Sequence, residues 1–394
     1  MPNLKRNLWL FYVINFLSNF WFFTPIAALY FAKQGGSATA AMTVFATMHI
    51  TTSFFEIPTG VLGDKMSRKG VLILSSVFAL IPVTIYAFST NLQMLLIGAA
   101  LAGFGNALSS GTGAAMAYET VKQLGRGKDF KKINAIWHTA FPASIGIASL
   151  IGGWLAISSL RLPYLVSIGT GVLYVIASCF LVEPKMEENH QDQSWFNHTK
   201  DSIIYLFTHK TQLYILGIAS LGWAISIQVM YKSISLLYES GGMPLLYFGI
   251  MGTLCEIASA TGMLSSHYVA KLWSEKSVLF VNTTISILCW YAATFASGIW
   301  IGVSVALALF LLGMRVPIIT HIKQIYIPDD KRATVLSIRN IVFTIITSVA
   351  ALVLGVLIDS YDPQFAYRVM TSVLILMLVF IALLPKEASH PQSG

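Results

Sequence analysis

The sequence predicts an all-α membrane protein with twelve transmembrane helices in two pseudo-symmetric bundles of six. Apolar residues make up 56% of the 394 positions and charged residues only 11%, more apolar surface than a water-soluble domain can bury. Apolar runs near 20 residues long recur along the chain, and a motif of the second run returns in the eighth. The runs are continuously apolar, which favours helices over the shorter alternating strands of a β-barrel.

Each of these runs is long enough to cross ~30 Å of hydrocarbon at ~1.5 Å per residue. They cover residues 8–31, 41–63, 70–89, 92–118, 133–157, 161–182, 212–238, 245–270, 277–297, 300–322, 333–358 and 364–384. The first run is longer than the apolar core of a signal peptide, so we expect it to stay in the mature protein as a helix.

The chain divides into an N-terminal bundle at residues 1–182, a cytoplasmic linker at 183–211 and a C-terminal bundle at 212–394. The linker is polar first and then carries apolar residues along one helical face, which predicts an amphipathic surface helix. The bundles show traces of duplication, because Glu56 and Glu256 share a flanking isoleucine 200 residues apart (256 − 56). Chance recurrence of common residues is the alternative for weaker matches such as Lys131-Lys132 and Lys331-Arg332.

The formal net charge of +8 marks membrane topology rather than a nucleic-acid partner. With the N-terminus inside, most lysines and arginines fall in cytoplasmic segments, and Lys33, Arg161 and Arg368 fall outside. We therefore expect a multi-pass protein of the inner (plasma) membrane with both termini in the cytoplasm. The three cysteines lie within apolar runs, where we expect packing residues and no disulfide, and no motif indicates a metal or other cofactor.

A short stretch between the second and third runs, GVLGDKMSRK, combines glycines, an acid and cations at a membrane surface. It resembles the loop signature of the major facilitator superfamily, with Gly60, Asp64, Arg68 and Lys69 in register and Ser67 where the pattern usually has glycine. The resemblance implies two bundles that rock around a central solute site. The corresponding segment between the eighth and ninth runs, SSHYVAKLWSEKS, keeps cations but has no Gly-x-x-x-Asp. We therefore expect the loop of the first half to contribute more to function.

The resemblance also implies a cytoplasmic gate that holds the two bundles closed when the site faces outward. Asp64 would lie at the N-terminus of the eleventh helix, where the helix dipole favours an anion, and Arg68 would pair with Glu119. The gating residues carried over are Gly60, Gly63, Asp64, Arg68 and Glu119.

Five ionisable residues stand inside the predicted spans, and each costs ~2.5–3.5 kcal/mol on insertion scales. They are Glu56, Glu256, Lys232, Arg315 and Arg339. Such residues are functional candidates, although static ion pairs between helices are the alternative. By the resemblance, spans 2, 5, 8 and 11 form the seam between bundles. We expect two related seam pairs, Glu56 with Arg339 and Glu256 with His138 (339 − 138 = 201), which would couple protons. A packing role is the alternative for His138.

Spans 1, 4, 7 and 10 line the central cavity in the superfamily, so their polar residues are the candidate solute ligands. These are Asn15, Asn19, Asn106, Gln228, Lys232 and Arg315. Amides and cations among nearby aromatic side chains suit an organic solute with an anionic or polar group.

The function predicted is secondary active transport of a small organic solute, with proton-coupled export, or antiport, as the leading interpretation. The sequence resembles the multidrug-exporter-like branch, but Ala148-Ser149 replaces the glycine-proline pair usual in the fifth span of proton-driven exporters. An uptake permease for an organic acid is the alternative, which Lys232 and Arg315 favour. A non-transporting receptor is less compatible with the intact loop. The absence of nucleophile, metal and phosphate-loop motifs argues against an enzyme. The expected partners are the solute, protons and the lipid bilayer, with no nucleic acid, and the working unit is expected to be a monomer.

Overall fold

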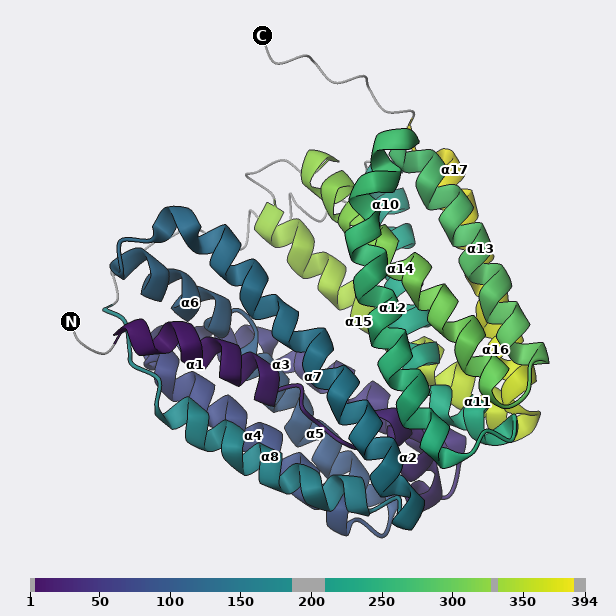
Figure 1. Cartoon of the computed structure of the whole chain (residues 1–394), viewed down its shortest axis with the longest axis horizontal. Coiled ribbons are helices and arrows are strands. Elements are labelled where there is room, and N and C mark those ends of the chain that lie inside the picture. The colour runs from purple at the N-terminus through teal and green to yellow at the C-terminus, as the bar shows by residue number, and fades with distance from the viewer. Residues whose placement is uncertain (1–3, 186–209, 327–331, 386–394) are drawn as a thin grey trace. The chain divides into compact units, whose positions relative to one another are not determined.

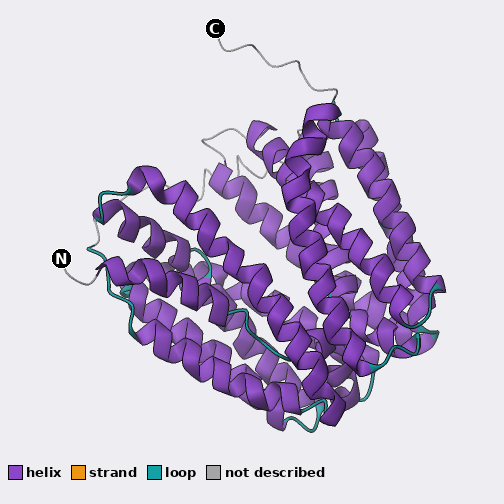
Figure 2. Cartoon of the chain, viewed as in Figure 1, coloured by secondary structure: helices purple, strands orange, loops and turns teal. Residues whose placement is uncertain are grey.

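The structure is a computed structural model of the chain and describes residues 4–185, 210–326 and 332–385. Within these ranges the regular elements are helices and no strand occurs (Figure 2). The amphipathic helix predicted for the linker lies outside the described residues, as do the linker residues from 186 to 209.

The chain forms two compact units. Unit 1 contains Met1–His190 and Met243–Thr253, and unit 2 contains Gln191–Gly242 and Leu254–Gly394. The segment from 243 to 253 belongs to unit 1 because it packs closely on helix α7, where the Thr253 hydroxyl donates to the Gly146 carbonyl at 2.7 Å. The bundle boundaries expected at residues 182 and 212 stay a prediction.

Unit 1 is built from helices joined by short connections (Figure 1). They are α1 (Leu4–Leu17), the 3₁₀ turn η1 (Thr24–Ile26), α2 (Ala27–Gly35), α3 (Ala38–Lys65), α4 (Arg68–Phe88), α5 (Leu92–Ser109), α6 (Thr112–Gln123), the 3₁₀ turn η2 (Gly127–Asp129), α7 (Phe130–Ser158) and α8 (Leu162–Cys179).

Small residues and buried aromatic rings hold these helices together. A Cβ at Gly103 of α5 would stand 2.5 Å from the Met48 carbonyl oxygen, so only glycine lets α3 and α5 approach this closely. The Tyr30 hydroxyl donates to the Tyr86 carbonyl at 2.7 Å, and the Tyr30 ring lies 4.3 Å from that of Tyr164. These contacts join α2, α4 and α8 at one end of the unit.

Unit 2 contains the remaining helices, and α12 passes from unit 1 into it. They are α10 (Lys210–Ser220), the π-helix η3 (Leu221–Tyr231), α11 (Ile234–Ser240), α12 (Leu245–Leu272), α13 (Glu275–Phe295), α14 (Ile299–Tyr326), α15 (Arg332–Ser360), α16 (Pro363–Val373) and α17 (Ile375–Leu383). The Tyr367 hydroxyl of α16 donates to the Met230 carbonyl of η3 at 2.9 Å and lies 2.6 Å from the Ser233 hydroxyl, which ties the seventh span to the twelfth.

Among the described residues, ten helices are long and apolar enough to cross a membrane, from Arg68–Phe88 to Pro363–Leu383. These correspond to the third to twelfth predicted spans. The first span is divided into α1, η1 and α2, and the second lies within α3. The helical fold class predicted from the sequence is confirmed.

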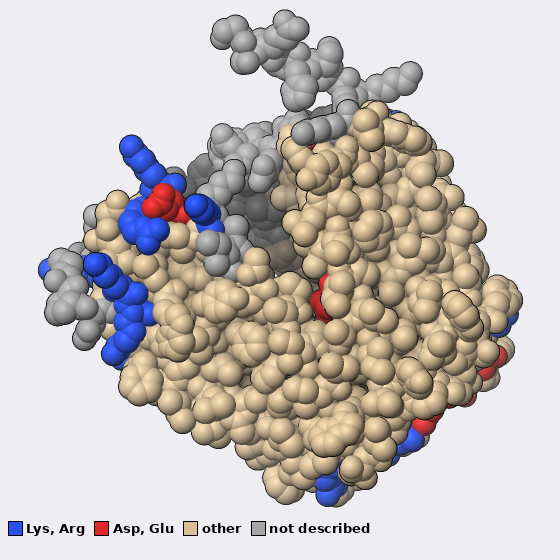
Figure 3. Space-filling view, viewed as in Figure 1, with Lys and Arg blue, Asp and Glu red and all other residues tan. Residues whose placement is uncertain are grey.

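The outer surface is suited to lipid. Large apolar side chains are exposed on many helices, and broad areas of the space-filling view carry no charged side chain (Figure 3). In unit 1, lysines and arginines gather at the end where α1 begins and α6 meets α7. That end is the one predicted to face the cytoplasm.

Candidate solute-binding sites of the two units

In unit 1 the first predicted cavity span is broken where its polar residues stand. Helix α1 stops at Leu17, and η1 begins only at Thr24. Within the break, the Asn19 amide donates to the Asn15 carbonyl at 3.0 Å, and the Trp21 indole donates to the Ser18 carbonyl at 2.7 Å. Side chains and neighbouring helices can satisfy a broken backbone inside a membrane. Asn15, in the last turn of α1, and Asn19, in the break, are both half-buried.

The fourth span is broken in the same way. Helix α5 ends at Ser109 and α6 starts at Thr112, because Gly111 adopts a positive φ of 77° that other residues rarely take. Asn106 lies one turn before the break, is exposed, and its carbonyl accepts from the Ser110 amide at 3.1 Å. The predicted ligand Asn106 thus stands at a helix end.

In unit 2 the seventh span was expected to be one helix and is instead three segments: α10, η3 and α11. The middle one is a π-helix of 11 residues, a rare form often found at functional sites. The last turn of η3 has the hydrogen bond of a π-helix, which joins residues five apart: the Lys232 amide donates to the Ile227 carbonyl at 3.1 Å. Gln228 lies within η3 and has a buried side-chain oxygen with no hydrogen-bond partner, while Lys232 directly follows it and is half-buried.

Each embedded glutamate accepts a hydrogen bond from a hydroxyl at one of these breaks. In unit 1, Glu56 of α3 accepts from Ser110, between α5 and α6, at 3.4 Å. In unit 2, Glu256 of α12 accepts from Tyr231, the last residue of η3, at 3.3 Å. Both carboxylates are half-buried. A change at either break would therefore change the surroundings of a titratable group.

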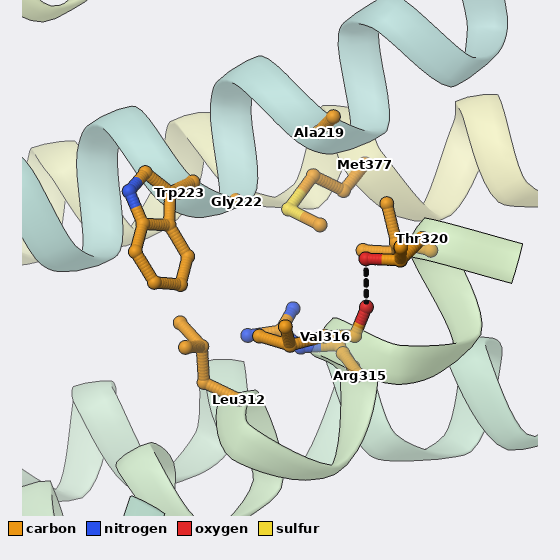
Figure 4. Close-up of a pocket in the computed structure, with 9 residues that line it drawn as sticks. Ala219, Gly222, Trp223, Leu312, Arg315, Val316, Thr320 and Met377 are labelled. Carbon is orange, nitrogen blue, oxygen red and sulfur yellow. Dashed lines mark hydrogen bonds between the residues drawn. The ribbon is translucent and has the colours of Figure 1, made fainter. Parts of the chain in front are cut away.

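Arg315 of α14 is buried, with 4% of the residue exposed. One terminal nitrogen donates to the Thr283 hydroxyl of α13 at 3.3 Å, and the other has no hydrogen-bond partner among the described residues. The residue lines a pocket of about 100 Å³ within unit 2 (Figure 4). The pocket is lined by Ala219, Gly222, Trp223, Leu312, Arg315, Val316, Ile319, Thr320 and Met377.

The other two residues predicted to couple protons are Arg339 and His138. Arg339 of α15 is 6% exposed and donates to the Gln212 side chain at 3.3 Å, with two further nitrogens lacking a hydrogen-bond partner. The side chain of His138 lies outside the described part of the chain. The pairing of Glu56 with Arg339, and of Glu256 with His138, stays a prediction.

The signature stretch is largely helical. Helix α3 continues through Gly60, Gly63 and Asp64 to Lys65, so only Met66 and Ser67 connect it to α4, and the side chain of Asp64 lies outside the described residues. Ser67 has an extended backbone, and its hydroxyl accepts from the Gly70 amide at 3.0 Å. The residue that departs from the family pattern is therefore the N-cap of α4.

The same helix start binds a carboxylate. Glu183, after α8, accepts from the backbone amides of Arg68 and Lys69 at 2.9 and 2.7 Å. Anions are favoured at helix N-termini, where amides lack intrahelical partners. The Arg68 Nη1 is buried without a hydrogen-bond partner, and no ion pair joins Arg68 to Glu119, two residues that the structure describes. The Arg68 and Glu119 pairing stays a prediction.

Sequence reasoning missed three contributors: Glu183, Thr283 and Met377. Glu183 carried a usable signal, because an acid directly after an apolar span can reach the start of a neighbouring helix. Thr283 and Met377 look like ordinary span residues, and only the packing of α13 and α17 against α14 and η3 reveals them.

Comparison with known proteins agrees with a fold of this kind. The sequence profile of the Major Facilitator Superfamily matches residues 8–322. The tetracycline resistance protein, class H, of Pasteurella multocida is 23% identical over 371 residues, which cover 89% of this chain and 87% of that protein. The uncharacterized MFS-type transporter YxaM of Bacillus subtilis (strain 168) is 20% identical over 92% of each chain.

Solved structures share the fold at low sequence identity. A point mutant of the nucleoside transporter NupG superposes with a TM-score of 0.81 at 15% identity, covering 98% of this chain and 100% of that one. A D-xylose-proton symporter gives a TM-score of 0.73 at 11% identity, covering 96% of this chain and 98% of that one.

The ten candidate spans among the described residues and the match to a family of transporters indicate a non-enzymatic membrane transporter of small molecules. The chain belongs to the major facilitator superfamily of secondary transporters.

Proposed function

We propose that this protein exports a small organic solute by alternating access, driven by protons. In this proposal the chain works as a monomer in the plasma membrane, with both termini in the cytoplasm, and protons and lipid are its further partners. The excess of lysine and arginine in the predicted cytoplasmic segments supports that orientation.

The observation that carries the proposal is the contact of each embedded glutamate with a helix break. Ser110 and Tyr231 hydrogen-bond Glu56 and Glu256. Asn106 and Lys232, the predicted solute ligands, lie within a few residues of these hydroxyls in the sequence. A solute that rearranges the break would withdraw the hydroxyl from the carboxylate. The proton affinity of a carboxyl group depends on such neighbours, so solute and proton binding become coupled.

Glu56 is the favoured proton carrier and Glu256 the comparison. The seam pairing proposed for Glu56 gives it Arg339, a permanently charged partner that the carboxylate could exchange during rocking. The corresponding partner of Glu256 is His138, which can itself titrate near neutral pH. A carrier that separates from its partner in one state changes its proton affinity between states.

Similarity to two tetracycline resistance proteins supports export as the direction, since a resistance protein protects the cell from a drug. A second function, uptake of an organic acid, is favoured by Lys232 and Arg315, because cations inside a membrane protein suit an anionic solute. The two functions differ in the direction of solute relative to protons.

Transport by the purified protein in proteoliposomes tests both functions. Vesicles are given an acidic or an alkaline lumen and offered tetracycline, other cationic drugs and organic anions. A proton antiporter concentrates its solute when the lumen is acidic, and a proton symporter does so when the external medium is acidic. Accumulation in acidic vesicles supports export, and the opposite pattern supports the uptake permease. A flux of any solute that ignores the pH gradient in both directions would contradict proton coupling.

A further inference from the structure

We infer that the pocket around Arg315 in unit 2 binds an amphiphilic organic anion, with the anionic group on the guanidinium and the apolar body against Trp223 and Met377. The inference rests on the proposed function only in that Arg315 is one of its predicted solute ligands. The pocket itself lies entirely within unit 2 and has its own geometry.

In this inference the Arg315 guanidinium binds the anionic group of the ligand. Arg315 is nine-tenths or more buried, its side chain faces the pocket, and one terminal nitrogen lacks a hydrogen-bond partner (Figure 4). The residues lining the pocket include no acidic side chain. A buried cation is costly unless an anion or hydrogen bonds compensate it, and Thr283 supplies only one neutral hydrogen bond. An anionic ligand would supply the missing acceptor and the missing charge.

The residues that line the pocket favour an apolar body for the ligand. Figure 4 shows Trp223 and Met377 across the pocket from Arg315, with Leu312 on the side of Arg315. The Thr320 hydroxyl is occupied, because it donates to the Val316 carbonyl at 2.8 Å. The remaining lining is aromatic, aliphatic or glycine. An inorganic anion would leave these walls in contact with water, whereas an aromatic or alkyl carboxylate would cover them.

The size and opening suit a small molecule. The accessible volume of about 100 Å³ is several times the roughly 10–15 Å³ that one water molecule requires, so the pocket has room for a small organic group. Trp223 is 40% exposed, so the pocket reaches the surface of unit 2 and is not a sealed packing defect. Trp223 is held there by the π-helix, whose wider turn sets the direction of its side chains differently from an α-helix.

Two sources have this chemistry: a dissolved solute with a carboxylate, and the phosphate of an anionic lipid. The probe is sodium benzoate, titrated calorimetrically into the delipidated full-length protein in neutral detergent. Octanoate tests an alkyl body, benzamide tests the charge, and acetate tests the apolar body. We expect benzoate and octanoate to bind at least about 10-fold more tightly than benzamide or acetate.

Variants connect the binding to the pocket. Arg315→Gln should weaken benzoate binding roughly 10- to 100-fold, because it removes a charge-assisted hydrogen bond. Val316→Phe keeps the charge but fills the pocket and should weaken binding at least about 10-fold. It serves if Arg315→Gln does not fold. The control is Arg368→Gln, which removes another unit 2 cation, one that lies 4.8 Å from the Phe295 ring and outside the pocket, and should leave binding unchanged.

Nanodiscs of phosphatidylcholine or phosphatidylglycerol distinguish the sources. Weaker benzoate binding in phosphatidylglycerol identifies competition by the lipid headgroup, and equal binding identifies a dissolved solute; both support an organic anion site. Wild-type benzoate affinity in both Arg315→Gln and Val316→Phe, or no binding of benzoate, octanoate and phosphatidylglycerol, would overturn the inference. Benzoate binding without pH-driven transport would keep this site and remove the proposed function. Proton-driven transport by a protein that binds none of benzoate, octanoate and phosphatidylglycerol would keep the proposed function and overturn this site.

Discussion

The beginnings of α4 in unit 1 and α13 in unit 2 are alike in backbone but differ in charge. Both follow a serine N-cap: Ser67 (φ −61°, ψ 139°) accepts from the Gly70 amide, and Ser274 (φ −62°, ψ 145°) accepts from the Ser277 amide. The sequences that follow, SRKGVL and SEKSVL, differ most at Arg68 and Glu275.

Each helix start is also tied to the end of its unit's last span, but with reversed polarity. In unit 1 the Glu183 carboxylate binds the amides at the N-terminus of α4. In unit 2 the Lys276 ammonium donates to the carbonyls of Ala382 and Leu384 at the end of α17. An anion at a helix N-terminus and a cation at a helix C-terminus are both favoured by the helix dipole. The two units therefore make the same connection with opposite charges.

The other charged residues beside these connections also differ. In unit 2, Glu275 pairs with His321 of α14 at 2.7 Å. In unit 1, Arg68 and Glu119, both in the described part of the chain, form no ion pair, and Arg68 lies four residues after the signature acid Asp64 (68 − 64). The comparison leads us to expect that unit 1 uses the charges of its signature stretch for gating, whereas Glu275 of unit 2 pairs within its own unit. Five predictions test it.

The largest effect is expected for Asp64→Asn at the signature stretch. If its carboxylate stabilises one closed state, removing the charge should lower transport on the order of 10- to 100-fold while expression stays normal. The measurement is initial transport rate in proteoliposomes. The comparison change in unit 2, Glu275→Gln at the position that corresponds to Arg68, should lower the rate by less than about 2-fold, because an ion pair near the surface contributes little. Equal losses in the two variants would remove the functional difference between the units.

The next effect concerns the repeated glutamates. Glu56→Gln should leave solute exchange intact and abolish accumulation driven by the pH gradient, because the glutamine cannot carry a proton. Glu256→Gln is the comparison and should retain most of the pH-driven accumulation. Exchange with labelled solute and accumulation under a gradient are measured on the same vesicles. If both variants still respond fully to pH, the carboxylates are structural.

Neutralising the cation at the end of the π-helix should produce a selective change. Lys232→Gln should weaken binding of anionic solutes about 10-fold and leave cationic solutes within about 2-fold, since a lost charge-assisted hydrogen bond contributes roughly 1.5–3 kcal/mol. Solute affinity is measured by competition in detergent, with Lys33→Gln as the surface control. An equal loss for both solute classes would assign Lys232 to packing.

Breaking the connections between span ends should lower stability without changing solute selectivity. Glu183→Gln and Lys276→Gln should each lower the free energy of unfolding by about 1–2 kcal/mol, because each removes a charge from helix-terminal hydrogen bonds. Thermal unfolding in detergent measures the effect, with Lys185→Gln, an exposed neighbour, as control. A loss in only one variant would show that the two connections are not equivalent.

The smallest effect is expected at the two caps. Ser67→Ala and Ser274→Ala should each cost about 1 kcal/mol, because each leaves a helix amide without its side-chain acceptor. Ser67→Gly restores the residue usual in the family pattern and should cost only a few tenths of a kcal/mol. Denaturation midpoints of the three variants provide the test. No loss at Ser67 alone would mean that Glu183 is sufficient to hold that helix start.

Much of the fold followed from composition and spacing, and less of the site did. The cost of burying charge identified Glu56, Glu256, Arg315 and Arg339 as unusual without any structure. The sequence predicts the seventh span as one helix, because hydropathy does not distinguish the backbone hydrogen bonds of an α-helix from those of a π-helix. Ser67 was read as a departure from a motif, although serine three residues before a glycine at a helix start is also an N-cap pattern.

The sequence by itself determined the membrane environment, the spans, the family and the residues that are costly to bury. The reason is that the cost of placing an apolar or a charged residue in the bilayer depends on that residue and its near neighbours in the sequence. Only the tertiary structure decided which hydroxyl reaches each glutamate, where the seventh span widens, and that Arg315 shares its pocket with Trp223 and Met377. Those contacts join residues far apart in the chain, such as Arg315 and Thr283 on neighbouring helices. Helix packing selects these partners, and packing depends on the shapes of whole helices rather than on any short pattern.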